Sequence, residues 1–506
     1  MLAKVLSSTL LGVEAHLVEV EVDLASGLPT FTTVGLPDAA IRESRERVKA
    51  ALANSGFPFP LKRITVNLAP AHLRKEGTAF DLPIALGILR AAGYLPGDAL
   101  HRYLVLGELS LDGRVKAVAG VMPMSFAARQ AEVAGLLVPA ENATEAAVSG
   151  VAPVFGVATL AQAVGFFTGS ETLTPTVCDV AALFRRTAVY EEDFADVRGQ
   201  AHVKRALEVA AAGGHNVLLI GPPGAGKSLM ARRLPSILPD MTLEEAIETS
   251  KIHSVAGLLS REKALVATRP FRAPHHSTSD AGLVGGGAMP TPGEVSLAHN
   301  GVLFLDELPE FRRSTLEVLR QPLEDAQVTI ARAALSVTFP ARFMLVAAMN
   351  PCPCGWRGDP QRTCLCSTQQ LQRYRARLSG PLLDRIDLHV EVPPVPYAEL
   401  RTAAPGEPSA AIRARVNAAR ARQRARFGGA LPHNAAMGVR EIRRYCKLDS
   451  AGEQLLAQAM RHFGLSARAC DRICKVARTI ADLAGEERIA AAHLAEAIQY
   501  RTLERW

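Results

Sequence analysis

Residues Gly221–Ser228 read Gly-Pro-Pro-Gly-Ala-Gly-Lys-Ser and match the phosphate-binding loop pattern G-x-x-x-x-G-K-[ST] at every defined position. The apolar run before this loop, Asn216–Ile220, has the length of a buried strand, and Leu229–Arg233 after it favours a helix. In such a strand–loop–helix unit, glycines let backbone amides surround phosphate oxygens, and the helix N-terminus adds partial positive charge. The sequence therefore predicts an α/β fold that binds a nucleotide.

A second segment, Gly301–Glu307, completes the predicted site. The four apolar residues Val302–Leu305 predict a buried parallel strand, and Asp306 and Glu307 follow at its carboxyl end, where open α/β sheets bind ligands. Asp306 is placed to hold Mg²⁺, directly or through water, and Glu307 is placed to polarise the attacking water. Together the two segments predict hydrolysis of a nucleoside triphosphate, with ATP as the expected substrate.

Three further segments extend this nucleotide site. Lys227 is expected to reach the β- and γ-phosphates and Ser228 to bind Mg²⁺, while Asp196–Gln200 could wrap the adenine. Met344–Asn350 predicts another buried strand, which would put Asn350 beside the γ-phosphate, where it helps to orient the water. The predicted nucleotide-binding residues are Val197, Gln200, Gly221, Pro222, Pro223, Gly224, Ala225, Gly226, Lys227, Ser228 and Asp306.

The composition is that of a large, multidomain chain. At 506 residues it is too long for one core, and 48% apolar residues are enough for several. No 18 consecutive residues are apolar, so we expect no membrane span, and the weakly signal-like N-terminus runs into a strand pattern typical of folded protein. Eight cysteines, four of them clustered, suit a reducing cytoplasm better than a disulfide framework. The net charge of +7 permits a polyanionic partner without requiring one.

Three regions and one linker follow from the pattern along the chain. Residues 1–168 alternate strands and helices, residues 169–193 begin with a Gly-, Ser- and Thr-rich stretch that predicts a linker, and residues 194–395 hold the nucleotide motifs. Residues 396–506 follow a proline-rich stretch and predict a helical region. In the first region we predict strands at Ile64–Leu68, Tyr103–Gly107 and Gly135–Pro139 and a helix at Ile84–Ala92.

On these motifs the chain resembles the AAA+ ATPases, and specifically the magnesium-chelatase-like ComM/YifB family. The resemblance covers essentially the whole chain and rests on Ala273–Ser279, Gly301–Leu308, Asn350–Gly355, Gly380–Asp387 and Lys475–Asp482. It implies an AAA+ P-loop ATPase core over residues 194–395 and a C-terminal helical lid over residues 396–506.

The family resemblance also assigns roles to three polar residues. It implies that Asn350 is sensor 1, Arg468 is sensor 2, and Arg385 is an arginine finger that completes a neighbouring subunit's site. A finger supplied by a neighbour requires a homo-oligomeric ring, usually a hexamer in this family, and it neutralises charge that develops on the transferred phosphoryl group. For Arg385 and Arg468 a structural salt bridge is the alternative. With Glu307, these three residues are the catalytic candidates.

The N-terminal region, residues 1–168, resembles the catalytic domain of Lon protease, a fold shared with a ribosomal-protein-S5-like domain. The resemblance fails at the active site. Ala79 stands where the protease carries its nucleophilic serine, and Ala119–Met124, where its lysine should lie, contains no lysine. Without a hydroxyl nucleophile and an amine base there is no mechanism for acyl transfer. We therefore expect a catalytically inactive domain that binds DNA, a partner protein or neighbouring subunits.

Four cysteines form the candidate metal site. They occur as two C-x-C pairs separated by nine residues, Cys352 and Cys354 followed by Cys364 and Cys366. Four thiolates suit tetrahedral Zn²⁺, although C-x-C is tighter than the usual C-x-x-C spacing. Structural zinc is the favoured interpretation, with free buried thiols or disulfides as alternatives.

Three segments are candidates for contact with a substrate. His275 and His276 lie in a segment that, by the family resemblance, runs to about Pro292 and faces the central pore; substrate contact, a structural loop and metal binding remain open for it. Alternation over Val328–Phe339 predicts a hairpin with Arg332 near its tip. The predicted helix Ile412–Phe427 carries arginines on two adjacent faces, which fits either phosphate contacts or, slightly better, a solvated or acid-paired helix. Its arginines are Arg413, Arg420 and Arg424 on one face and Arg415, Arg422 and Arg426 on the other.

The family resemblance favours an ATP-driven ring motor that acts on single-stranded or branched DNA, namely a branch-migration helicase in the recombination of incoming DNA. A protein-remodelling ATPase is the alternative. The motor subunit of a magnesium chelatase is a further alternative, less favoured because such motors typically lack the Lon-like domain.

Overall fold

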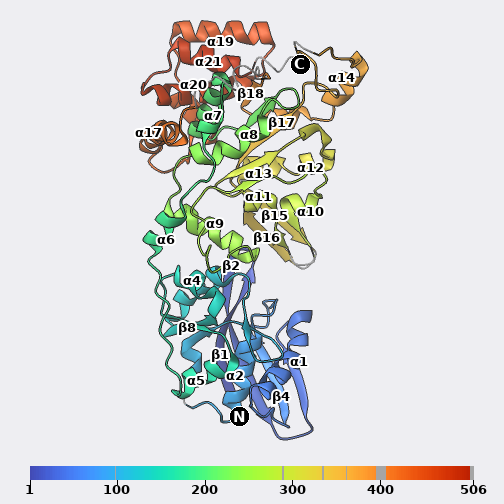
Figure 1. Cartoon of the computed structure of the whole chain (residues 1–506), viewed down its shortest axis with the longest axis vertical. Helices are drawn as coiled ribbons and strands as arrows, with labels where there is room; N and C mark the ends of the chain where they lie inside the picture. The colour runs from blue at the N-terminus through green and yellow to red at the C-terminus, as the bar shows by residue number, and fades with distance from the viewer. Residues whose placement is uncertain (97–98, 288–289, 333–334, 360–361, 395–405, 502–506) are drawn as a thin grey trace.

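A computed structural model describes residues 1–96, 99–287, 290–332, 335–359, 362–394 and 406–501. Along its longest axis the N-terminal region lies at one end, the ATPase sheet in the middle and the C-terminal helices at the other end (Figure 1). In the described part of the chain, no helix is both long and apolar enough to cross a membrane.

The N-terminal region is built on a seven-stranded mixed sheet in the order β3-β4-β2-β1-β5-β8-β9. The strands are β1 Leu2–Leu11, β2 Glu14–Ala25, β3 Thr30–Val34, β4 Arg63–Ala69, β5 Tyr103–Val105, β8 Gly135–Pro139 and β9 Val154–Val157, with a small β6 Glu108–Leu109 and β7 Val115–Lys116 pair. The helices are α1 Ala39–Asn54, α2 Asp81–Ala91, α3 Val121–Ala127, α4 Ala143–Ala147 and α5 Leu160–Thr168. The predicted strands and helix of this region are confirmed to within a few residues.

The predicted linker, residues 169–193, contains one helix, α6 Val180–Thr187. The side chain of Asp179 accepts a hydrogen bond from the backbone N–H of Ala182 and so caps the first turn. The predicted boundary between residues 395 and 396 lies outside the described residues.

The central region is a five-stranded, fully parallel sheet in the order β11-β14-β17-β10-β18. Its strands are β10 Val217–Ile220, β11 Phe271–Arg272, β14 Val302–Leu305, β17 Met344–Met349 and β18 Leu388–Glu391. The residues of β10, β14 and β17 are buried throughout, as expected for strands covered on both faces. Since the strands are parallel, the segments that follow β10, β14 and β17 all emerge at the same carboxyl edge.

Helices cover this sheet and connect its strands. They are α7 Ala201–Gly213, α8 Lys227–Arg233, α9 Leu243–Val255, α10 Asp280–Val284, α11 Glu294–Leu297, α12 Arg313–Glu317, α13 Arg320–Asp325, α14 Thr368–Arg375 and α15 Gly380–Leu383. Two short strand pairs accompany them, β12 Gly285–Gly286 with β13 Thr291–Pro292, and β15 Gln327–Arg332 with β16 Leu335–Pro340. The second pair confirms the predicted hairpin; residues 333 and 334 between its strands lie outside the described residues.

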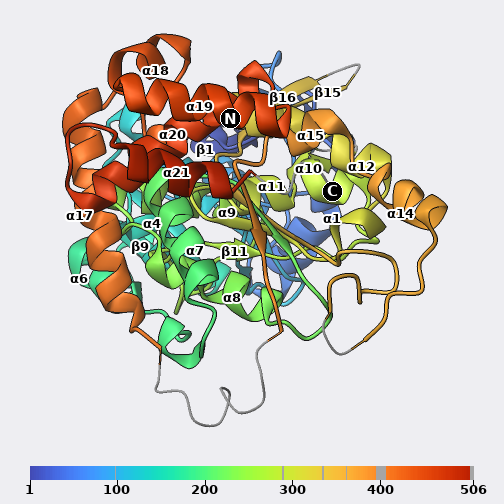
Figure 2. The same ribbon diagram turned by 90° about the horizontal axis from the view of Figure 1, so that it is seen from above.

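The C-terminal region is helical, as predicted. It consists of α17 Ser409–Phe427, α18 Val439–Tyr445, α19 Ser450–Phe463, α20 Ala467–Ala484 and α21 Ala491–Gln499. Viewed from above, α19, α20 and α21 gather on one side of the ATPase sheet and α14 projects on the other (Figure 2). Apolar residues of α17, α20 and α21 share one core with α7 and β10, so the helical region is packed directly on the ATPase sheet.

The arginines of α17 bind mainly within the chain. Arg415 pairs with Glu208 and Glu407, and Arg426 pairs with Asp482. Arg413 lies 3.4 Å from Asp240, Arg420 donates to the carbonyls of Pro432 and Ala211, and Arg422 donates to the carbonyl of Asp482. These contacts favour the structural interpretation of the helix over a continuous phosphate-binding stripe.

The N-terminal region contacts the ATPase region at α3 and at the turn between β1 and β2. The start of α3 packs on α9, where the Gly120 N–H donates to the Ser254 carbonyl at 2.9 Å and the Met122 N–H donates to the Ser254 hydroxyl at 3.3 Å. The turn between β1 and β2 touches the β15–β16 hairpin, since a Cβ added at Gly12 would lie 2.5 Å from Val337 Cγ1. The segment in which a protease would carry its lysine is therefore part of an interdomain contact.

Candidate ATPase site

The phosphate-binding loop connects β10 to α8, as predicted. Gly224 and Gly226 have φ of +78° and +88°, values that favour glycine and let the chain turn sharply before the helix. Lys227 Nζ donates to the carbonyls of Gly221 at 2.6 Å and Pro222 at 2.9 Å. Burial lowers the pKa of Lys227, while the carboxylates of Asp306 and Glu307 act in the opposite direction.

Side chains from three strands meet at this loop. The Ser228 hydroxyl donates to Asp306 Oδ2 at 2.6 Å, and Lys227 Nζ donates to Asn350 Oδ1 at 3.2 Å. Because Ile220 pairs with Met349 in the β10–β17 register, Asn350 leaves the sheet directly beside the loop. The hydroxyl and the carboxylate are hard oxygen ligands of the kind Mg²⁺ prefers, so this pair fits the predicted magnesium site.

Glu307 lies at the end of β14 in a left-handed conformation, with φ of +51°. This conformation is rare for a residue with a side chain and clusters at functional sites. The Glu307 side chain is 57% exposed, and its Oε2 lies 3.4 Å from His276 Nδ1. The contact follows from strand order. Phe271 pairs with Val302 in the β11–β14 register, and the same register carried forward sets His276 opposite Glu307.

Gln200 and Val197 are the two predicted nucleotide-binding residues that precede α7. The Gln200 side chain donates to the carbonyls of Ala225 at 2.9 Å and Pro393 at 2.7 Å, so it braces the loop against the segment after β18. Val197 is 2% exposed, and its side chain belongs to the core of the ATPase region. Of the two, Gln200 is the one in contact with the phosphate-binding loop.

Arg385 and Arg468 are not brought to this loop by any described contact. Arg385 precedes β18, at the amino edge of the sheet, and pairs with Glu324 of α13. Arg468, at the start of α20, is 78% exposed and lies 3.9 Å from Asp384. Four-residue strands at ~3.3 Å per residue separate the two edges by roughly 13 Å, so the Arg385 guanidinium lies at the opposite edge from its own chain's phosphate-binding loop.

The four clustered cysteines come together as predicted from their spacing. Their sulfur atoms all lie within 4.8 Å of one another, with Cys352 Sγ 3.3 Å from Cys354 and 3.6 Å from Cys364. Tetrahedral Zn²⁺ with ~2.3 Å bonds needs sulfurs roughly 3.8 Å apart, which this cluster approaches. All eight cysteines are free thiols, so the disulfide alternative is not adopted.

The cysteine loop also contacts the nucleotide site. A Cβ added at Gly355, whose φ is +84°, would lie 2.7 Å from Pro223 Cδ in the phosphate-binding loop. A bulkier residue at this position would displace one loop or the other.

Comparison with known proteins identifies relatives along the whole chain. Residues 193–400 match the family model for magnesium chelatase, subunit ChlI; residues 20–142 match the model for subunit ChlI of Mg-chelatase; and residues 406–501 match the model for its C-terminal part. Competence protein ComM of Haemophilus influenzae is 48% identical over all of this chain and 98% of its own. The chain belongs to the ComM/YifB family.

A second full-length relative extends this assignment. Uncharacterized protein YifB of Escherichia coli is 45% identical over 98% of this chain and 96% of its own. The chloroplastic magnesium-chelatase subunit ChlI of Oryza sativa is 24% identical over only 37% of this chain and 44% of its own. Membership of the ComM/YifB family, which is magnesium-chelatase-like and AAA+, implies ATPase activity with ATP and Mg²⁺ as ligands.

Sequence patterns did not reveal that His276 contacts Glu307. The His275-His276 pair was visible in the sequence, but it lies 31 residues before Glu307 with no local signal that links them. Only the pairing of β11 with β14 brings the two side chains together, and strand neighbours in a parallel sheet are not given by strand order along the chain.

Proposed function

We propose that this chain is an ATP-driven ring motor that acts on DNA, a branch-migration helicase supporting homologous recombination in natural transformation. One observation carries the DNA assignment: a relative named a competence protein is 48% identical over the full length of the chain, not over the ATPase region alone. Protein remodelling is the alternative, and the chelatase-named family models keep a chelatase motor as a further one.

The two predicted pore segments support a motor that grips a polymer. The His275–Pro292 segment and the β15–β16 hairpin are neighbours, because a Cβ added at Gly286 would lie 3.8 Å from Arg332 Nη2. Arg332 is exposed. The Arg332 guanidinium beside the glycine-rich His275–Pro292 segment is suited to contact phosphates without regard to base sequence. Translocation along DNA requires contacts of this kind.

The position of Arg385 supports a ring. An arginine at the amino edge of the sheet cannot reach the nucleotide bound at the carboxyl edge of its own chain. In a ring, the Arg385 of one subunit could instead contact the nucleotide bound by the adjacent subunit. Arg468 lies close to Arg385. Burial and the charges of Arg320, Arg472 and Arg468, in that order, lower the pKa of Arg385. We infer that both arginines serve the site between adjacent subunits of a homo-oligomer, and a hexamer is the expected ring.

The deciding experiment is the ATPase rate of the full chain with no DNA, with single-stranded DNA and with a four-way junction, at two salt concentrations. We expect stimulation by DNA that is strongest with the junction and weakens as salt rises, because phosphate contacts release counterions. Absence of both stimulation and DNA binding would favour protein remodelling, and dependence on a porphyrin would identify a chelatase motor.

His276 is proposed to couple the pore segment to hydrolysis. A histidine nitrogen beside the carboxylate competes with water for Glu307, and His276 lies near the start of the segment that is proposed to touch the substrate. His276→Ala is expected to raise the DNA-independent ATPase rate and to reduce the ratio of stimulation by DNA. The measurement is the rate with and without DNA, with His275→Ala as the matched control, and an unchanged ratio would contradict the coupling role.

Structural zinc is proposed for the four-cysteine cluster. Because the cysteine loop lies against Pro223, loss of the metal is expected to lower Tm by about 5 °C or more and to weaken ATP binding. The measurements are elemental analysis, with one zinc per chain expected, and scanning fluorimetry after chelation. Cys178→Ser, outside the cluster, should leave both values unchanged. Absence of zinc together with an unchanged Tm would show reduced thiols instead.

A further inference from the structure

A cavity of about 500 Å³ lies at the amino edge of the ATPase sheet, away from the phosphate-binding loop. Gly214, Gly301 and Phe343 line it, and these residues precede β10, β14 and β17. The start of α9 forms one wall, and the opposite wall comes from α17 and the turn that follows it. The cavity therefore lies between the ATPase sheet and the C-terminal helices.

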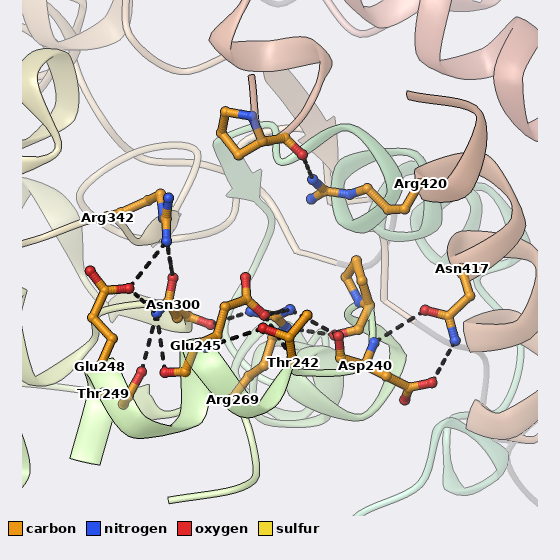
Figure 3. A network of polar contacts seen from close by, with 12 residues as sticks. Asp240, Thr242, Glu245, Glu248, Thr249, Arg269, Asn300, Arg342, Asn417 and Arg420 are labelled. Atoms are coloured by element: carbon orange, nitrogen blue, oxygen red, sulfur yellow. Dashed lines mark hydrogen bonds and ion pairs between the residues drawn. The ribbon is translucent and has the colours of Figure 1, made fainter. Parts of the chain in front are cut away.

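Four arginines line this cavity, and two of them are held by partners in its wall. Arg269 donates to Glu245 at 2.9 Å and to the carbonyls of Pro239 and Asn300. Arg342 donates to Asn300 Oδ1 at 2.8 Å and lies 3.5 Å from Glu248 (Figure 3). The guanidinium groups of these two residues therefore already have acceptors within the protein.

The other two arginines, Arg420 and Arg424 of α17, have no carboxylate partner among the described residues. Arg420 donates only to the carbonyls of Pro432 and Ala211, and its Nε is buried with no hydrogen-bond partner in the described chain. The Arg424 side chain makes no hydrogen bond or ion pair with any described residue and is exposed. Figure 3 shows Arg420 on the side of the network opposite Arg342.

Two acids of the cavity wall, Asp240 and Glu245, have partners of their own. The two Asp240 carboxylate oxygens are used by Asn417 at 2.7 Å and Arg413 at 3.4 Å, and Glu245 caps α9 and binds Arg269. Glu244 is exposed. Burial, together with the Arg269, Arg424 and Arg342 charges, lowers the pKa of Arg420 to about 9, while the Glu245 carboxylate acts in the opposite direction. The charged form of this side chain is therefore destabilised where it lies.

A neutral histidine also lies in the wall of this cavity. His433 lines the cavity, and its Nδ1 is buried with no partner in the described chain. Burial and the Arg420 charge hold the pKa of His433 well below its usual value, so the imidazole is neutral and can donate one hydrogen bond from Nδ1. The exposed Arg424 guanidinium is the donor open to the cavity, and Arg420 Nε and His433 Nδ1 are buried donors without partners in its wall.

We propose that this cavity is a second anion-binding site, which takes a small molecule carrying a phosphate group between the guanidinium groups of Arg420 and Arg424. Phosphate oxygens accept several charge-assisted hydrogen bonds from arginines. Leu238, Phe343 and Leu431 add apolar wall, and the volume lies in the range of small-molecule sites. A ligand here would contact both the ATPase sheet and the C-terminal helices. The proposal does not depend on the DNA assignment.

The test is isothermal titration of the full chain with inorganic phosphate and, separately, with AMP, at constant ionic strength. Arg424→Ala is the main variant because its exposed, unpartnered side chain can be removed without disturbing the fold; Arg420→Gln is the second. Arg422→Ala is the matched control, since Arg422 lies on the same helix and does not line the cavity. Lys227→Ala reports binding at the phosphate-binding loop instead.

In the Lys227→Ala background, which removes binding at the phosphate-binding loop, we expect each cavity substitution to weaken binding about tenfold or more, while Arg422→Ala changes it less than about twofold. Tighter binding of AMP than of phosphate would identify a mononucleotide-sized ligand, and equal affinity would identify free phosphate; both support the site. The proposal is overturned if neither probe binds, or if Lys227→Ala abolishes binding that Arg424→Ala leaves intact.

Discussion

Glu307→Gln is expected to leave ATP binding intact and to reduce the rate of ATP hydrolysis by ~10²–10⁴-fold, the usual contribution of a general base. Glutamine keeps the length and branching of the side chain and removes only its ability to accept a proton. Because the Glu307 side chain is 57% exposed and lies outside the core, the substitution should not alter stability measurably.

The measurement for Glu307 is kcat from steady-state turnover together with Kd for ATP. Glu310→Gln is the matched control, because Glu310 lies three residues further on and pairs with Arg377 at 2.8 Å. The kcat of Glu310→Gln should stay within about twofold of the kcat of the unsubstituted protein. If Glu307→Gln keeps more than about a tenth of the original rate, another group activates the water.

Arg385→Ala is expected to reduce hydrolysis by ~10³-fold or more while ATP still binds, because an arginine finger stabilises the transition state and not the bound nucleotide. Removing Arg385 leaves Glu324 unpaired, but that carboxylate is 59% exposed, so the loss of the surface pair should cost little stability.

Mixed rings test whether Arg385 acts on a neighbour. Arg385→Ala chains retain Lys227, and Lys227→Ala chains retain Arg385, so each preparation alone should be inactive. If the finger is supplied by a neighbour, mixing the two creates some interfaces with both residues intact, and activity should return. If Arg385 acts within its own chain, no mixture can restore it. Arg114→Ala, an exposed arginine of the N-terminal region, serves as the control.

The nucleotide site was largely predictable because its signals are local. Gly224, Gly226 and Lys227 lie within one turn, and the carboxyl-edge rule for parallel strands then places Asp306 and Asn350 beside them. The structure confirms that these groups meet, through the Ser228–Asp306 and Lys227–Asn350 hydrogen bonds. The catalytic roles assigned to them remain predictions until the rates above are measured.

The arginines of α17 show that a sequence pattern does not predict the partners of a side chain. On a helical wheel Arg413, Arg420 and Arg424 share one face and are equivalent. In the fold, Arg413 lies beside Asp240 and Arg420 donates to two backbone carbonyls. Arg424 has no side-chain partner among the residues that the structure describes. A helical period fixes which side chains point the same way, but partners such as Ala211 come from elements some 200 residues away in sequence.

Local sequence patterns are enough to identify the chemistry of this protein: a phosphate-binding loop, two carboxylates after a buried strand, four thiols at close spacing, and membership of the ComM/YifB family. Each of these features depends on residue types at short separations in the sequence. Local backbone geometry brings such residues together wherever the same pattern occurs. Contacts between distant segments place His276 beside Glu307, Arg385 at the edge opposite its own nucleotide loop, and Arg420 and Arg424 at the border of a cavity. Those placements depend on which strands become neighbours and how the C-terminal helices pack on the sheet, and both are set by burial of apolar surface over the whole chain, not by any local pattern.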